Sequence, residues 1–547
     1  MHLTAGLLLA LAPRVLGVVH LPSVFGNGMV LQTNTEYGQR SFVYGSASVG
    51  EVVVVNLTIG KSTTSYTTVA DATGAWDIQL NPEQAGPDSA EIAVAGSSDE
   101  FAAVLRIHDV MFGDVFLCSG QSNMDFSIMA AFGGDEIAAT PYPYLRLFPV
   151  AEGGAVNPQA DVPAFINATE TPCWWWQTQA PNASASYACN KWQAAAPGAT
   201  EYFSAVCLLT ALELSRAYTA NRTIGLVFSA VGGTAISNWM PPEALAACNV
   251  TESPAAAVPP APARSPPVLE CPSCLYNAMI APFERFALRS FLWYQGEADS
   301  GLAPGEYSCR FSALIAAWRD RWRIGAVGFS FVQLAPQFVP TQPDYGWFNI
   351  RLEQAAVLPG GARDVDGTGM AAALDLGDRT SPYPPDHVHI RNKTEVARRL
   401  AAAVLHDQYA LQWPAGGFNA TGVVNWRGPL AVSASQDTGG AQLRVVFDTV
   451  DGSPVTLGDT AGCWECCSGG RDTVQVAANA SGPWVNATVA VSNAARHAAP
   501  REWAVGVRAL RRTHVAAVRR VLLGQRDARP AGPPLRECIR LCLSCRS

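Results

Sequence analysis

The sequence predicts an α/β protein in which a doubly wound parallel sheet is flanked by β-sandwich domains. Between residues 109 and 410, nearly continuous apolar runs such as TIGLVFSAVGG and SFLWYQGE each end in glycine or a polar residue. Helical stretches such as YFSAVCLLTALELSRAYTA separate them. On either side of this region, apolar residues instead recur with a period of two. Continuous apolar runs indicate buried parallel strands, whereas alternation is typical of antiparallel sheets with one solvated face.

At 547 residues the chain is too long for one hydrophobic core, so we expect several domains. An apolar first segment, too short and interrupted to span a bilayer, predicts a signal peptide. A Pro- and Ala-rich stretch without periodicity predicts a surface insertion. The expected segments are a signal peptide at 1–18, an N-terminal β-sandwich at 19–108, the α/β domain at 109–410 with its insertion at 251–272, a C-terminal β-rich region at 411–510, and a basic, Cys-bearing tail without an assignable fold at 511–547.

The composition excludes some classes of partner. Apolar residues make up 49% of the chain and charged residues 15%, which favours a globular protein. The net charge of −8 argues against a polyanion-binding surface, so we expect no nucleic-acid partner. We also expect no stable membrane insertion, and the oligomeric state stays open.

Two features predict that the protein is secreted or lysosomal. Fourteen cysteines suit an oxidising compartment in which disulfides persist. Their spacings also allow a zinc site, but the paired half-sites that tetrahedral zinc needs are incomplete, so we expect no metal. N-x-S/T triplets exceed the roughly three expected by chance; they begin at Asn56, Asn167, Asn182, Asn221, Asn249, Asn392, Asn419, Asn479 and Asn486.

Ser122 is the first candidate nucleophile. It follows the apolar run GDVFLC in a turn of small residues, and a possible helix follows it. Gly120 lets the backbone bend sharply, and a helix start offers unpaired N–H groups that stabilise an oxyanion. Taken alone, the pattern favours a helix-capping serine.

Asp386 and His389 strengthen the nucleophile hypothesis. They stand three residues apart in the Pro-rich loop SPYPPDHVHIRNK, just before an expected helix. A loop of this kind can direct an imidazole at a serine while the carboxylate fixes its tautomer, as acyl transfer requires. His387 is the rival base, and a surface Asp-His pair without a role is the alternative.

Five ordered motifs resemble the sialate O-acetylesterase family, which belongs to the SGNH or GDSL hydrolases. The motifs are GQSNM at 120–124, FSAVGGTAISNWM at 228–240, LYNAMIAP at 275–282, WYQGEAD at 293–299 and D-x-x-H at 386–389. The resemblance implies an SGNH-hydrolase sheet and a carbohydrate O-acetylesterase that acts on O-acetylated sialic acids through an acetyl-enzyme. It implies no cofactor.

The resemblance also implies roles for individual residues. Ser122 would be the nucleophile, His389 its base and Asp386 the residue that orients the histidine. The backbone N–H of Ser122, Gly233 and the side chain of Gln295 would form the oxyanion hole. The family's catalytic histidine is followed by proline, whereas Ile390 stands here.

Other functions remain open at this stage. Acetylated xylan or another polysaccharide is a rival substrate to sialic acid. A carbohydrate-binding protein with an unused esterase centre is a second alternative. Glu297 with Asp299 or Asp386 resembles a glycosidase pair, but we expect Glu297 and Asp299 to brace loops. Trp239, Trp293 and Tyr294 are expected in the core or the pocket wall.

Overall fold

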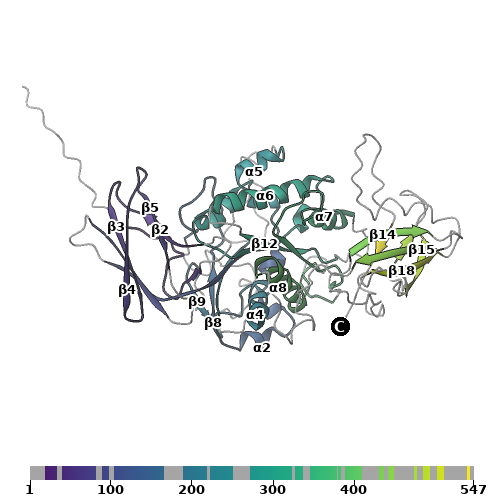
Figure 1. Cartoon of the computed structure of the whole chain (residues 1–547), viewed down its shortest axis with the longest axis horizontal. Coiled ribbons are helices and arrows are strands. Elements are labelled where there is room, and N and C mark those ends of the chain that lie inside the picture. The colour runs from purple at the N-terminus through teal and green to yellow at the C-terminus, as the bar shows by residue number, and fades with distance from the viewer. Residues whose placement is uncertain are drawn as a thin grey trace, which may run out of the picture.

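The computed structural model describes residues 19–33, 40–81, 89–97, 104–164, 189–217, 222–250, 271–322, 327–336, 345–378, 380–383 and 388–409, together with the backbone of six C-terminal strands. The predicted signal peptide and most of the 251–272 insertion and of the 511–547 tail lie outside these residues. Figure 1 shows the N-terminal strands at one end, a body of helices around a sheet in the middle, and a second sheet at the other end.

A mostly parallel sheet forms the centre of the molecule. Its strand order is β13-β12-β11-β7-β10-β8-β9, and every neighbouring pair is parallel except β8 with the edge strand β9. The chain adds strands on one side of β7 and then on the other, which is the doubly wound order. The strands are β7 (Leu105–Gly120), β8 (Tyr142–Pro149), β9 (Gln193–Ala195), β10 (Thr223–Ala230), β11 (Ser290–Tyr294), β12 (Gly328–Gln333) and β13 (Thr368–Ala372).

Helices cover both faces of this sheet (Figure 1). On one side α5 (Pro242–Ala247), α6 (Glu306–Trp322) and α7 (Tyr345–Ala355) pack together. On the other, α4 (Ala205–Ala217) contacts α8 (Lys393–Tyr409), and α8 also contacts β12 and β13. The shorter helices are α1 (Ser122–Asp125), η1 (Ile128–Ala130), α2 (Gly134–Ala138), η2 (Ile236–Trp239), η3 (Tyr276–Ile280), η4 (Ala281–Phe283) and η5 (Glu297–Asp299).

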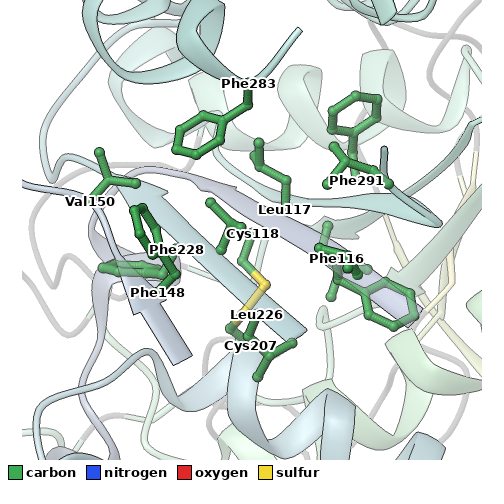
Figure 2. Packing of buried hydrophobic residues seen from close by; sticks show 14 of the residues in the cluster. Phe116, Leu117, Cys118, Phe148, Val150, Cys207, Leu226, Phe228, Phe283 and Phe291 are labelled. Carbon is green, nitrogen blue, oxygen red and sulfur yellow. A yellow bond between two sulfur atoms is a disulfide. The ribbon is translucent and has the colours of Figure 1, made fainter. Parts of the chain in front are cut away.

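The core lies between these layers because the central strands are apolar on both faces. All eight residues of β10 are buried, and so are the last eleven of β7. Figure 2 shows Phe116 and Leu226 beside the Cys118–Cys207 disulfide, which joins β7 to α4. Disulfides also join Cys248 to Cys309 and Cys271 to Cys274, which confirms the disulfide prediction.

The N-terminal strands are continuous with the central sheet through β7. The first half of β7 pairs antiparallel with β6 (Ala90–Gly96), which pairs with β3 (Val52–Ile59) and through it with β4 (Ser62–Val69). β1 (Val30–Gln32) adds to β7 in parallel, and β2 (Ser41–Ser46) pairs with β5 (Ala75–Leu80) in a separate two-stranded sheet. The expected boundary at residue 108 therefore falls inside a strand, and a separate N-terminal sandwich is not confirmed.

A second sheet follows the α/β body. It has six antiparallel strands in the order β14-β15-β18-β17-β16-β19. The strands are β14 (Leu430–Gln436), β15 (Gln442–Asp448), β16 (Val474–Val476), β17 (Val485–Ser492), β18 (Glu502–Ala509) and β19 (Ile539–Leu541). Five of them lie in the expected β-rich region, and the sixth comes from the tail. A C-terminal sandwich likewise remains a prediction.

Candidate active site

Three of the predicted site residues follow strands that end at one level of the sheet. The strand registers place Ala230 of β10 and Tyr294 of β11 on either side of Gly120, the last residue of β7. The loops that follow these three strands therefore begin side by side at the carboxyl edge of the sheet. This is beside the position where the strand order changes direction. The predicted residues in these three loops are Ser122, Gly233 and Gln295.

The turn that carries Ser122 depends on a glycine. Gly120 has a φ of +140°, and a Cβ at this position would overlap the backbone of Tyr294 in the neighbouring strand. Gln121 then fixes the turn, because its N–H donates to Tyr294 O (3.0 Å) and its Oε1 accepts the N–H of Ala298 (3.2 Å). Ser122 begins α1 and is partly exposed.

His389 lies beside this turn. Its loop meets the residue after Ser122, because Asn123 Nδ2 donates to Val388 O (3.1 Å). The imidazole is 3% exposed and stacks on Phe126, with 6.2 Å between ring centroids. Within the described residues Ser122 Oγ and His389 share no hydrogen bond, which is common in unliganded sites. Asp386 and the rival base His387 lie outside the described residues.

The loop after β10 leaves open space at Gly233. This glycine is exposed with a φ of +77°, and a Cβ built on it would meet no atom within 4 Å. Neither its N–H nor that of Ser122 has an acceptor within the described residues. Two backbone donors at the sheet edge are therefore available to a ligand.

Gln295 is buried and already hydrogen-bonded. Its amide nitrogen donates to Thr234 O (3.1 Å) and to Asp299 Oδ2, and its Oε1 accepts from Tyr307 OH (3.1 Å). Both amide hydrogens thus have acceptors in this structure. Gln295 would have to exchange one of these bonds to reach an oxyanion.

Glu297 and Asp299 contact protein groups in neighbouring loops. Asp299 Oδ2 also accepts the N–H of Ile236 (2.8 Å), so it joins the loop after β10 to the loop after β11. Glu297 Oε1 accepts Asn123 Nδ2 (2.7 Å). Burial raises the pKa of Glu297, against the opposing effect of the Asn123 hydrogen bond. These contacts agree with the bracing role expected for both carboxylates.

Two buried residues at the site, Lys393 and Asn123, were not predicted from the sequence. Lys393, the first residue of α8, is fully buried and donates through Nζ to Asn123 Oδ1 (2.5 Å). Burial lowers the pKa of Lys393 to about 7. Asn123 stands inside the GQSNM motif, and its place next to the nucleophile was the only available hint.

The aromatic residues near the site and two of the cysteines considered as zinc ligands have structural roles. Trp239, Trp293 and Tyr294 are fully buried, so they belong to the core. Cys271 and Cys274 form a disulfide with each other, which removes them as thiolate ligands of zinc. In the part of the chain that the structure describes, no helix is both long and apolar enough to cross a membrane.

Comparisons with known proteins agree with this fold and with the family that the motifs resemble. Residues 112–406 match the model of the family described as "Carbohydrate esterase, sialic acid-specific acetylesterase". The sialate O-acetylesterase of Rattus norvegicus is 32% identical over 439 residues, covering 72% of this chain and 74% of the relative. The human sialate O-acetylesterase is 32% identical over 416 residues, covering 73% of each. A solved carbohydrate acetylesterase from Xanthomonas citri is 26% identical with a TM-score of 0.64, covering 90% of this chain and 92% of its own.

The fold, the motifs at the carboxyl edge of its sheet and these likenesses define the class: the protein is a hydrolase of the carbohydrate esterase type. The chain belongs to the sialic acid-specific acetylesterase family. The family resemblance predicted from the five motifs is therefore confirmed.

Proposed function

We propose that this protein hydrolyses O-acetyl esters of sialic acids through an acetyl-enzyme on Ser122. One observation carries the proposal: a partly exposed serine lies at the carboxyl edge of a parallel sheet, with a buried histidine in the adjoining loop and two backbone N–H groups at the same edge that have no acceptor among the described residues. This combination supplies the nucleophile, the base and the oxyanion donors that acyl transfer needs.

The reaction proceeds in two halves. His389 accepts the proton of Ser122 as Oγ attacks the acetyl carbonyl, and the sugar oxygen leaves with that proton, forming acetyl-Ser122. Water then attacks the acetyl carbonyl while His389 accepts its proton. Acetate leaves, and His389 returns the proton to Oγ. We assign to Asp386 the role of orienting the imidazole, because it occupies the aspartate position of the D-x-x-H motif.

The oxyanion would accept hydrogen bonds from the N–H groups of Ser122 and Gly233, each worth about 3 kcal/mol in the transition state. Gln295 would be the third donor, once it exchanges its bond to Thr234 O for one to the oxyanion. Such an exchange keeps its amide paired throughout, which limits the cost of the movement.

Burial of the imidazole supports its role as base. Water is largely excluded from the 3%-exposed histidine, so the proton passes between Ser122 and His389 rather than to solvent.

Acetate release tests the proposal. Wild type and Ser122→Ala would be compared on 4-nitrophenyl acetate, 9-O-acetylated sialic acid and acetylated xylan. We expect the wild type to prefer the sialic acid ester and the variant to lose more than about a thousandfold in kcat. Equal turnover by both proteins contradicts the serine mechanism, and a preference for xylan assigns the polysaccharide instead.

A serine-directed covalent probe tests the carbohydrate-binding alternative. An esterase should label at Ser122, whereas a binding protein with an unused centre should not. Gln32→Leu serves as a matched control, since this buried residue pairs with Gly113 in the middle of β7, seven positions before Gly120, and should leave labelling intact.

We also propose secretion or lysosomal residence. The disulfides among the described cysteines support an oxidising compartment, as do the N-x-S/T triplets. Treatment of cell-expressed protein with an N-glycosidase should lower its apparent mass, and an unchanged mass would count against export.

A further inference from the structure

We propose that Asn123 and Lys393 form a clamp that positions the nucleophile turn against the histidine loop, and are positioning residues for the reaction. The inference rests on the proposed function, because it assigns work to residues that hold Ser122 and His389. It concerns neither the nucleophile nor the base itself.

The hydrogen bonds of Asn123 connect three loops and a helix. Its Nδ2 donates to Val388 O (3.1 Å), next to the proposed base, and to Glu297 Oε1 (2.7 Å) after β11. Its Oδ1 accepts from Lys393 Nζ (2.5 Å) at the start of α8. Asn123 itself adjoins Ser122 in the chain. One amide therefore joins the segments that carry the nucleophile and the base.

Lys393 fixes which way this amide points. With an N–H₃ donor on one side and two oxygen acceptors on the other, the reversed orientation would set the amide nitrogen against the lysine donor and the amide oxygen against Glu297 and Val388 O. The side chain of Asn123 is 1% exposed, so water is not at hand to relieve such a mismatch. Removal of the lysine frees the amide to turn away from Val388.

The free-energy cost of burying Lys393 argues that this side chain does more than fill space in the core. An ammonium at the first position of α8 opposes the helix dipole, and the group is 0% exposed. The rings of Phe126 and Tyr294 lie close to it, with Nζ 4.6 and 5.1 Å from their centroids, and the carboxylates of Glu297 and Asp378 favour its charged form. A methionine would fill this space without the desolvation penalty.

The clamp acts on the rate of acylation rather than on substrate binding. A displacement of the histidine loop by about 1 Å lowers a rate on the order of a hundredfold. Asn123 and Lys393 are both buried, so neither is expected to contact the sugar. Loss of the clamp should therefore lower kcat and leave KM nearly unchanged.

Asn123→Asp provides the sharpest test because it keeps the shape of the side chain. The change replaces the donor to Glu297 and Val388 O with an acceptor, so the link breaks. We expect kcat for acetate release to fall on the order of 10–100-fold, labelling of Ser122 by a serine probe to slow in parallel, and KM to stay within about threefold. The double variant Asn123→Asp with Glu297→Gln restores a donor on the Glu297 side and should regain part of the rate.

Two further variants keep the test decisive. Lys393→Met removes the donor without changing volume greatly, and it carries the test should Asn123→Asp fail to fold. Gln32→Leu is the matched control: this buried amide makes three hydrogen bonds beside the middle of β7, away from Gly120, and should lower Tm while kcat per folded molecule stays at the wild-type value.

The outcomes separate this inference from the proposed function. A wild type that releases no acetate and does not label at Ser122 contradicts the proposed function. An active wild type whose Asn123→Asp and Lys393→Met variants keep kcat within threefold, or change only in KM, overturns the clamp and leaves the esterase proposal standing.

Discussion

Replacement of the buried Lys393 by methionine should change how the stability of the protein depends on pH. Burial lowers the pKa of this lysine from 10.5 to about 7 in the folded protein. Between these values the unfolded chain binds a proton that the folded protein does not, so the wild type gains stability as the pH rises. One proton corresponds to about 1.4 kcal/mol per pH unit.

The magnitude follows from the same shift. At pH 7 the burial of Lys393 costs the folded state about 4 kcal/mol, and about 3 kcal/mol of this is recovered by pH 9.5. Lys393→Met removes the cost at every pH, so its advantage over the wild type should be largest near pH 7 and shrink by about 3 kcal/mol toward pH 9.5. Without the ammonium, Glu297 holds its proton more firmly, which shifts the difference in the same direction.

Urea unfolding followed by tryptophan fluorescence measures this difference. The buried Trp239, Trp293, Trp318 and Trp322 all report on the α/β body. Lys61→Met, at an exposed position, is the control and should follow the wild type at each pH. A free-energy difference between Lys393→Met and wild type that stays constant or widens from pH 7 to 9.5 would refute the reasoning.

Three further predictions concern the sheet and the rim of the site. Gly120→Ala forces a Cβ onto the backbone of Tyr294 at a φ of +140°, so kcat should fall at least tenfold and Tm should drop, measured by acetate release and calorimetry; unchanged values would contradict the close approach. Replacing Cys118 and Cys207 together by alanine opens a link across 89 residues and should cost up to about 4–5 kcal/mol of unfolding free energy in urea, with a loss below about 1 kcal/mol counting against it. Phe132 is 52% exposed ten residues after the nucleophile, and Phe132→Ala should raise KM for the acetylated sugar several-fold but not for 4-nitrophenyl acetate; equal changes in both would exclude a sugar contact.

The sequence predicts the site through the strand ends rather than through individual side chains. The apolar runs before Ser122, Gly233 and Gln295 are buried on both faces, so their pattern shows both the strands and their termini. Parallel strands bring their carboxyl ends to one edge, which places the three loops together. The family resemblance implies the roles of these three residues, and the structure shows where they lie.

The predicted domain boundary near residue 108 falls inside a continuous strand for a physical reason. β7 is one strand of sixteen residues whose burial changes along its length, from alternating at Leu105 to complete after Asp109. The change in the hydrophobic pattern reflects a change in the segments that cover the strand, and it does not mark the end of the strand. Hydrophobic periodicity records burial, so it places a boundary wherever burial changes.

The clamp residues could not be predicted because burial of a polar side chain is a tertiary property. Asn123 and Lys393 are 270 positions apart in the chain, and each alone reads as a surface residue. Only the folded structure shows that the two side chains form a hydrogen bond with each other. Polar networks of this kind are visible in a fold and not in its hydrophobic pattern.

The three-residue helix η5 connects the two halves of the proposed mechanism. Its first residue, Glu297, accepts from Asn123 and so supports the link between nucleophile and base. Its last residue, Asp299, accepts from Ile236 N–H and from Gln295, and so ties the loop of Gly233 to the end of β11. Two carboxylates facing protein donors in this way are poorly placed to serve a sugar as acid and nucleophile, which argues against the glycosidase pair. Their spacing of two residues instead lets one short turn connect the loops that carry the proposed base and the proposed oxyanion donors.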